Sequence, residues 1–331
     1  MSGDIGMGVK NRIFKYYFPQ KAVDLKQKRR GNCNGIVLMY HEVLEDSIDI
    51  PAWTIVKRSN FEWQMKYLRN NFDVVTMDEA TKRVCGLSEG QRPFAVVTFD
   101  DGYKGNFNNV LPVMNKLSLP FVVYVATKAV SDSSIYWYDK IIGLLDKRDD
   151  LFISIEGDDI PIRKSHSNSK RWSLMQKALS KLKSMSASER DIEVKKILDE
   201  NDARSFSSRI GMLSASDLGA MSKHQLVTIG NHTHGHELLD QISGLEIYNT
   251  INKANCLIES WTGIKPKHFA YPNGNYSENV LDALSAFGFS TLVTTKPGIW
   301  DGSRSLMEIP RLGIGRFETK SQFKARLAGF L

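Results

Sequence analysis

The most informative segment of this chain is Ala95-Val-Val-Thr-Phe-Asp-Asp-Gly-Tyr103. Its β-branched and aromatic residues predict a short buried strand that ends at two adjacent carboxylates and a glycine. Because side chains alternate along a strand, Asp100 and Asp101 are expected to point in different directions and to do two different jobs at one site. The alternative is a solvated turn. Core strands rarely end in paired acids, because burying an unpaired charge is costly.

Length and composition describe an ordinary globular protein. The 331 residues suffice for one large α/β domain or two smaller ones, and 42% of them are hydrophobic and 24% charged. The three cysteines, Cys33, Cys85 and Cys256, are far apart, which argues against a disulfide framework and fits a reducing compartment. The N-terminus lacks the apolar core of a secretion signal, so we expect a cytoplasmic protein.

The positive charge is concentrated at the start of the chain. Residues 1–30 contain eight Lys and Arg and two Asp, so they account for six of the seven net positive charges. Aromatic residues lie among these cations, and such a basic arm fits peripheral contact with the inner face of a membrane. A solvated first helix is the alternative. We expect no nucleic-acid binding, because the rest of the chain has no basic stripe.

Strand and helix patterns alternate along residues 31–331, which we predict to form a single domain. This alternation predicts a largely parallel sheet, and a barrel in particular, with functional residues at the carboxyl ends of the strands. Residues 131–212 differ, because they are polar and rich in Lys, Ser and Asp, and helical from about 170 to 198. We interpret them as an insertion and not as a separate catalytic unit. The expected strands cover 36–41, 72–76, 94–99, 121–126, 226–230 and 290–294, and the expected helices 61–68, 111–117, 243–262 and 277–287, with another starting at 77.

Reactive side chains follow three of the expected strands. These are His41, the pair Asp100-Asp101, and the segment His232-Thr-His-Gly-His236. On a helical turn, His232 and His236 would share one face. Two imidazoles and one carboxylate form a common site for a catalytic divalent metal with open positions for water. The alternative is that these histidines are ordinary polar residues.

Three motifs together resemble those of the NodB-type polysaccharide deacetylases, carbohydrate esterase family four. They are Thr98-Phe-Asp-Asp-Gly-Tyr103, His232-Thr-His-Gly-His236 and Phe269-Ala-Tyr-Pro-Asn-Gly274. The resemblance covers roughly residues 35–315, and its first two motifs are the specific ones. It implies a distorted (β/α) barrel of the NodB-homology type, here with a helical insertion. It also implies removal of acetyl groups from N-acetylated sugars with Zn²⁺ or a similar divalent ion.

The resemblance also implies roles for individual residues. Asp101, His232 and His236 would bind the metal, and Asp100 would be the general base. The backbone N–H of Tyr103 would help to hold the oxyanion. His234 falls at a variable motif position and is expected to face solvent or to support the ligands. The third motif would bind the substrate, through Tyr271, Pro272 and Asn273. Tyr271 and the segment Tyr136-Trp-Tyr138 are candidates for an aromatic sugar platform, although aromatic residues at these spacings are more often core.

Two departures from the common family pattern concern the partners of these residues. Ala270 stands where the family has an arginine that orients the base, and no histidine after His268 is left to act as the late general acid. Both gaps resemble the branch of the bacterial poly-N-acetylglucosamine deacetylases, whose early Tyr-His and late Pro-Arg are matched here by His41 and Arg311. His41 is therefore the candidate acid that protonates the leaving amine, and Arg311 the candidate partner of Asp100. The alternatives are a capped strand end for His41 and a surface ion pair for Arg311.

These observations predict a metal-dependent deacetylase that acts on the N-acetyl group of an amino sugar. A protein without a secretion signal would meet a lipid-linked or nucleotide-linked sugar, as in O-antigen or capsule assembly, more readily than a finished polymer. Two alternatives stay open at this point. One is a catalytically silent homologue that still binds carbohydrate, and the other is a hydrolase of sugar O-acetyl or N-formyl groups.

Overall fold

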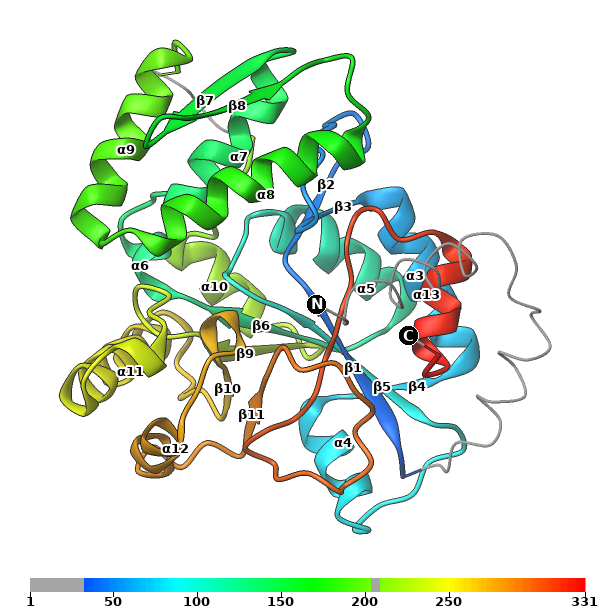
Figure 1. Ribbon diagram of the computed structural model, residues 1–331. Helices are drawn as coiled ribbons and strands as arrows, with labels where there is room; N and C mark the ends of the chain where they lie inside the picture. Colours follow the sequence, from blue (N-terminus) through cyan, green and yellow to red (C-terminus); the bar gives the residue numbers. More distant parts are fainter. Residues whose placement is uncertain (1–32, 204–208, 331) are drawn as a thin grey trace, which may run out of the picture.

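The computed structural model describes residues 33–203 and 209–330, and the predicted basic arm at residues 1–30 lies outside the described residues. A curled parallel sheet of eight strands forms a half-barrel at the centre of the molecule (Figure 1). The predicted distorted (β/α) barrel is thereby confirmed. Its strands, in spatial order, are β11 (Thr291–Val293), β10 (His268–Ala270), β9 (Val227–Asn231), β6 (Phe121–Val125), β5 (Phe94–Phe99), β1 (Gly35–Tyr40) and β12 (Leu312–Gly313), with β4 (Asp73–Val74) on β5.

The strand register brings the predicted reactive segments to one edge of the sheet. Strands β1 and β5 pair from Gly35–Phe94 to Tyr40–Phe99, and β6 and β9 pair as far as Val125–Asn231. All of these pairs are parallel, so the carboxyl ends of the strands lie at the same edge. His41, Asp100 and His232 each follow directly after one of these strand ends.

Amphipathic helices cover the sheet and bury its hydrophobic residues. In α3, the spacing of Phe61, Met65 and Leu68 puts all three on one buried face. Burying a side chain of this size contributes about 1.5–3 kcal/mol to folding. The helices of this layer are α3 (Arg58–Asn71), α4 (Met77–Val84), α5 (Leu111–Leu117), α10 (Ala215–Ser222), α11 (Gly244–Thr262), α12 (Glu278–Ser285) and α13 (Lys320–Leu327).

Local capping explains where several of these helices begin and end. Helix α11 begins after Ser243, whose side chain and that of Glu246 form a reciprocal capping box, and it ends at Gly263 with a φ of 73°. The helix predicted over residues 243–262 is thereby confirmed.

The described part of the chain holds no helix with the length and apolar character needed to cross a membrane.

Short elements tie the loops at the carboxyl edge together. Strands β2 (Glu42–Leu44) and β3 (Ile55–Lys57) form a separate parallel pair, and the π-helix η1 (Asn106–Val110) follows the Asp-Asp-Gly turn. Asn106 and Asn109 of η1 donate side-chain hydrogen bonds to the carbonyls of His41 and Val43, at 2.9 and 2.8 Å. The other short elements are α6 (Thr127–Ser131), η2 (Leu239–Gln241) and η3 (Pro272–Gly274).

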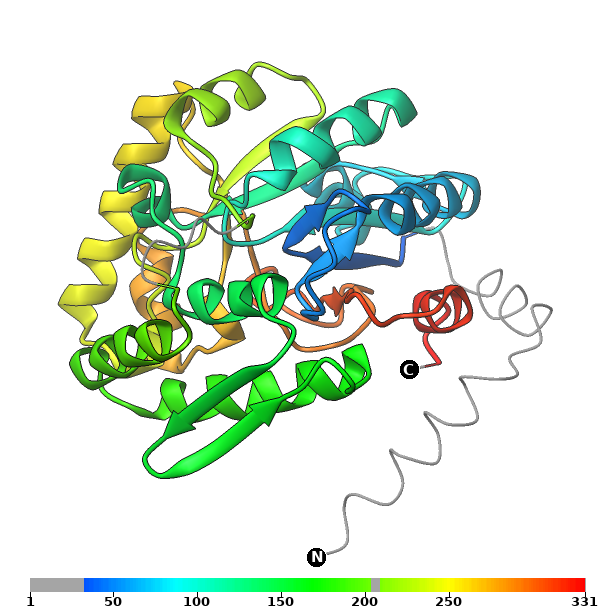
Figure 2. The same cartoon turned by 90° about the horizontal axis from the view of Figure 1, so that it is seen from above.

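The region predicted as an insertion shares a hydrophobic cluster with the loop at residues 44–55 and with Tyr103. Its elements are α7 (Trp137–Lys147), β7 (Leu151–Ile155), β8 (Asp158–Ile162), α8 (Asn168–Ser184) and α9 (Ala187–Glu200). They surround buried side chains that include Ile141, Ile153, Met175 and Ile197, and they group together in both views (Figures 1 and 2).

Two details of this region differ from the sequence prediction. The helix expected over residues 170–198 is two helices, because Ser186 starts a new capping box with Glu189. The antiparallel hairpin of β7 and β8 was not predicted at all. It turns at Glu156 and Gly157, which both have a positive φ.

Candidate active site

Three side chains from two loops converge at the carboxyl edge of the sheet. Oδ1 of Asp101 lies 3.3 Å from Nε2 of His232 and 3.3 Å from Nε2 of His236. The three atoms all lie within 4.8 Å of one another. The structure therefore brings together the three residues that the sequence analysis assigned to a metal.

The loop between His232 and His236 is not the helical turn that we expected. Its backbone takes a left-handed conformation at Thr233 and at His236, with φ of 66° and 59°. The side chain of Asn231 fixes the start of this loop by accepting a hydrogen bond from the Thr233 N–H at 2.7 Å. Nδ1 of His234, by contrast, lies 2.9 Å from Oγ1 of Thr127. The two histidines thus converge through local turns of the loop and not through a shared helical face.

The chemistry of these groups fits a divalent metal. Nδ1 of His232 lies 2.8 Å from the carbonyl oxygen of Ala270, which can only accept, so this nitrogen carries a proton, and in the neutral ring Nε2 has a free lone pair. Oδ1 of Asp101 is buried and has no hydrogen-bond partner among the described residues. Two imidazole nitrogens and one carboxylate oxygen form a donor set that suits Zn²⁺ and leaves positions open for water and substrate.

Asp100 forms a buried, bidentate ion pair with Arg311. The Nη1 and Nη2 atoms of Arg311 donate to Oδ1 and Oδ2 of Asp100 at 2.7 and 2.6 Å. Arg311 is 0% exposed, and it also donates to the Thr294 carbonyl at 2.8 Å and to Oγ1 of Thr98 at 3.2 Å. The structure thus places Arg311 in the interior of the protein and not in a surface ion pair.

The surrounding charges keep both acids ionised. Burial opposes ionisation of Asp100, but the Arg311 charge outweighs it and lowers the pKa of this carboxyl. Burial likewise opposes ionisation of Asp101, yet the His232 and His236 rings hold the pKa of Asp101 well below its ordinary value. For His232, burial favours the neutral ring, but the two carboxylates raise its pKa overall.

His41 lies at the end of β1, beside the strand that delivers the two acids. The Asp100 N–H donates to the carbonyl of Tyr40 at 3.0 Å, which makes His41 and Asp100 neighbours at the sheet edge. The His41 ring packs edge-on against Trp53, with ring centres 5.9 Å apart, and its buried Nδ1 has no partner among the described residues. Burial lowers the pKa of His41, although the charges of Asp101 and Asp100 oppose this shift.

Tyr103 is buried, and neighbouring segments contact both its backbone and its hydroxyl. Its backbone bridges to Met212 through two hydrogen bonds, Lys104 N–H to Gly211 O and Leu213 N–H to Gly102 O, and neither uses the Tyr103 N–H. The Tyr103 hydroxyl donates to Oδ2 of Asp139 at 2.9 Å, and both residues are about 1% exposed. Asp139 was not predicted from the sequence. The only signal in the sequence is its position directly after three aromatic residues, near the start of a helix.

The third motif is arranged differently from what we expected. Tyr271 is 0% exposed and its hydroxyl donates to the Met307 carbonyl at 3.0 Å, so the structure places it in the core and not on a sugar-binding surface. Pro272 is also buried. Asn273 is exposed, and its side-chain oxygen accepts a hydrogen bond of 2.8 Å from Lys183 in α8.

The aromatic segment before α7 lies beside the metal ligands. The Tyr136 and Tyr138 rings stack with centres 5.0 Å apart and planes 8° apart. Their centres lie 5.7 and 6.1 Å from the His236 ring. Of the predicted aromatic platform, Tyr136 and Tyr138 are therefore the members that reach the site.

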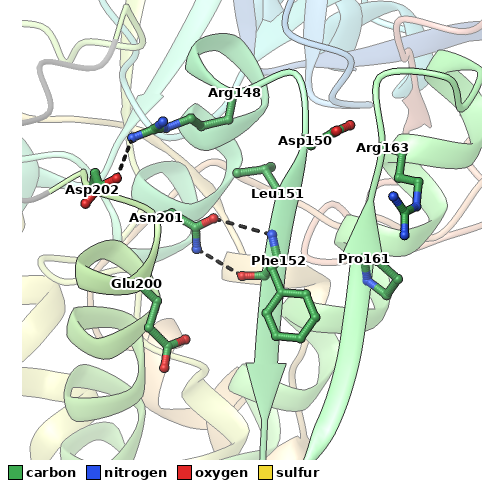
Figure 3. Close-up of a pocket in the computed structure, with 9 residues that line it drawn as sticks. All are labelled: Arg148, Asp150, Leu151, Phe152, Pro161, Arg163, Glu200, Asn201 and Asp202. Atoms are coloured by element: carbon green, nitrogen blue, oxygen red, sulfur yellow. Dashed lines mark hydrogen bonds and ion pairs between the residues drawn. The ribbon is translucent and has the colours of Figure 1, made fainter.

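A separate cavity of about 340 Å³ lies in the inserted region (Figure 3). Asn201, one of its lining residues, makes two hydrogen bonds to the backbone of Phe152, at 3.4 and 3.0 Å. Its lining contains none of the predicted catalytic or metal-binding residues, being formed by Arg148, Asp150, Leu151, Phe152, Pro161, Arg163, Glu200, Asn201 and Asp202.

Comparisons with known proteins identify the family and agree with the fold. Residues 88–292 match the family model described as polysaccharide deacetylase. YxkH of Bacillus subtilis (strain 168) is 27% identical over 96 residues, which are 28% of this chain and 32% of that protein. The alignment thus spans about a third of this curated relative.

Solved structures share the fold across most of the chain. The Streptococcus pyogenes deacetylase PplD, solved in complex with acetate, matches with a TM-score of 0.60 at 14% identity, over 89% of this chain and 98% of that one. IcaB from Ammonifex degensii matches with a TM-score of 0.54 at 18% identity, over 90% of this chain and 96% of that one. The family match, which covers more than half of the residues, and the motifs that supply the converging side chains lead to one conclusion: this chain belongs to the polysaccharide deacetylase family.

Proposed function

We propose that this protein is a metal-dependent deacetylase that hydrolyses the N-acetyl group of an amino sugar in a glycan or a glycan precursor. The observation that carries the proposal is the pair of adjacent acids with different partners. Asp101 faces two histidine nitrogens at 3.3 Å, while Asp100 is held by the Arg311 guanidinium. In this proposal one acid would bind a metal and the other would accept a proton.

Hydrolysis of the amide adds water across the C–N bond and releases acetate and a free amine. When bound, a divalent metal would polarise the amide carbonyl and make a water molecule more acidic. Asp100, ionised and oriented by Arg311, would accept the proton of the attacking water. The Tyr103 N–H would donate to the oxygen that becomes negative, and His41 would give a proton to the departing nitrogen.

The substrate proposal follows from the family and from the predicted basic arm. We propose an N-acetylated glycan, or a lipid-linked or nucleotide-linked sugar, as the substrate. Membrane contact through residues 1–30 belongs to the same proposal. Deleting these residues should reduce binding to vesicles that contain anionic lipid and leave turnover of a water-soluble substrate unchanged. Equal vesicle binding by both proteins would remove the membrane part.

The test of the function is release of acetate from N-acetylated glycans, measured with Zn²⁺ added and after chelation. Activity should require metal and should be lost in Asp101→Ala and in His236→Ala. Turnover at the wild-type rate in either variant would refute the proposal. Parallel assays with N-acetyl, O-acetyl and N-formyl sugars separate the proposed amidase from an esterase or a deformylase.

A catalytically silent carbohydrate-binding homologue is the second candidate, and a specific observation motivates it. Ala270 occupies the position of the family's arginine, and it contributes only a backbone carbonyl to the site. Metal and glycan binding without any release of acetate would favour this candidate.

A further inference from the structure

Two of the three metal-binding residues have a backbone conformation that L-amino acids rarely adopt. The φ angles are 75° at Asp101 and 59° at His236. A non-glycine residue in this left-handed region costs on the order of 1–3 kcal/mol and persists only where its surroundings hold it. Neighbouring side chains must therefore hold these two residues in place.

One side chain contacts both of them. The Tyr136 hydroxyl donates to the backbone carbonyl of Asp101 at 3.2 Å. The Tyr136 ring lies against the His236 ring, with centres 5.7 Å apart and planes at 60°. Tyr138 stacks on the Tyr136 ring and also packs on His236, so the Tyr136 ring has little freedom to move.

The segment that carries Tyr136 is itself anchored to the catalytic loop. Tyr136 is the residue immediately before α7, and Asp139 in the first turn of this helix accepts the hydrogen bond from the Tyr103 hydroxyl. Residues 136–139 thus contact Asp101 in the Asp-Asp-Gly turn, Tyr103 directly after this turn, and His236 in the histidine loop.

We propose that Tyr136 is a positioning residue, which holds Asp101 and His236 in the geometry that binds the metal. The inserted region then contributes to the catalytic centre through its first residues, although it supplies no metal ligand. This inference rests on the proposed function for the identity of the site. It makes a separate claim, that metal affinity depends on a side chain outside the three motifs.

The decisive variant is Tyr136→Phe, which removes the hydroxyl and keeps the ring. The matched control is Tyr276→Phe, which removes a part-buried hydroxyl that hydrogen-bonds Glu308. The affinity of each metal-free protein for Zn²⁺ is measured by competition with a chromophoric chelator. Thermal unfolding of the same metal-free samples reports whether the fold is intact.

We expect Tyr136→Phe to weaken Zn²⁺ binding by about 10-fold, as is typical when a partner of a metal ligand is lost. Tyr136→Ala, which also removes the ring from His236, should weaken it further. The Tyr276→Phe variant should bind Zn²⁺ like the wild type. At limiting Zn²⁺ the kcat of Tyr136→Phe should fall, and saturating Zn²⁺ should restore most of it, which a general loss of stability would not produce.

A folded Tyr136→Phe protein whose Zn²⁺ affinity stays within about two-fold of the wild type would overturn the inference. If Tyr136→Ala fails to fold, the Phe variant still decides the question. A wild-type protein that binds Zn²⁺ but releases no acetate would refute the proposed function and leave this inference standing. A wild-type protein that binds no Zn²⁺ would refute both.

Discussion

Replacing Arg311 with methionine should destabilise the fold, because it leaves the Asp100 carboxylate buried without its partner. Arg311 makes two hydrogen bonds to this carboxylate, at 2.7 and 2.6 Å, and two more to Thr98 and Thr294. Methionine has a similar length and no polar side-chain hydrogen, so it preserves most of the packing against Tyr124 while removing every one of these bonds.

Breaking a buried ion pair by removing one partner costs about 3–5 kcal/mol. A typical domain is stable by about 5–15 kcal/mol, so Arg311→Met should lose a large fraction of the stability and still fold. Asp100→Leu should cost a similar amount, because it leaves the guanidinium unpaired. The double variant removes both charges, and its cost should be well below the sum of the two single costs.

The assay is urea unfolding of the wild type, both single variants and the double variant, all in chelator so that metal binding makes no contribution. The double-mutant cycle should give a coupling free energy on the order of 3 kcal/mol between Arg311 and Asp100. A loss below about 1 kcal/mol in Arg311→Met, or single costs that add to within about 0.5 kcal/mol, would show that Arg311 and Asp100 are not energetically coupled.

Three further predictions concern pH, metal and proton transfer. Burial and the Asp101 charge raise the pKa of Asp139 well above its ordinary value, so this residue should make the protein less stable as pH rises above about 4. Asp139→Asn keeps an acceptor for Tyr103 and should remove that part of the pH dependence in urea unfolding; an unchanged slope would argue against it. Chelation should lower the melting temperature of the wild type, since ligand at 100 times its Kd stabilises by about 2.7 kcal/mol, and should leave that of Asp101→Ala unchanged. His41→Gln should lower kcat by about 10²- to 10⁴-fold at an unaltered Zn²⁺ affinity, and a parallel loss of affinity would contradict its role as the acid.

The sequence was most informative where local pattern and topology agree. The strand Phe94–Phe99 has the predicted bounds, because its β-branched and aromatic residues and the following Asp-Asp-Gly define both ends. Parallel pairing then places Asp101 and His232 at one edge. The expected helical turn between His232 and His236 was wrong, yet the two side chains still converge, because left-handed residues bend the loop back on itself.

The sequence pattern could not predict which distant residues contact one another. The buried Tyr271 donates its hydroxyl to the Met307 carbonyl, and the partner of the Tyr103 hydroxyl is Asp139, 36 residues away. The short β7–β8 hairpin has alternating burial, but its helical neighbours dominate the composition of the region. For Tyr271 and Tyr103, tertiary packing decides which residue is the partner.

The position of Arg311 bears on whether the site is catalytic or silent. Arg311 directly precedes β12, which pairs with β1, and its side chain also donates to Thr294 after β11, so it reaches Asp100 from a segment other than the one that contains Ala270. The buried Asp100 carboxylate thus has a cation as its partner, although Ala270 stands at the motif-three position. A buried ion pair is often no more stabilising than apolar residues of the same size, so stability alone does not explain this arrangement. An ionised, oriented carboxylate beside a metal site is what hydrolysis requires. The missing motif-three arginine is therefore weak support for a silent homologue.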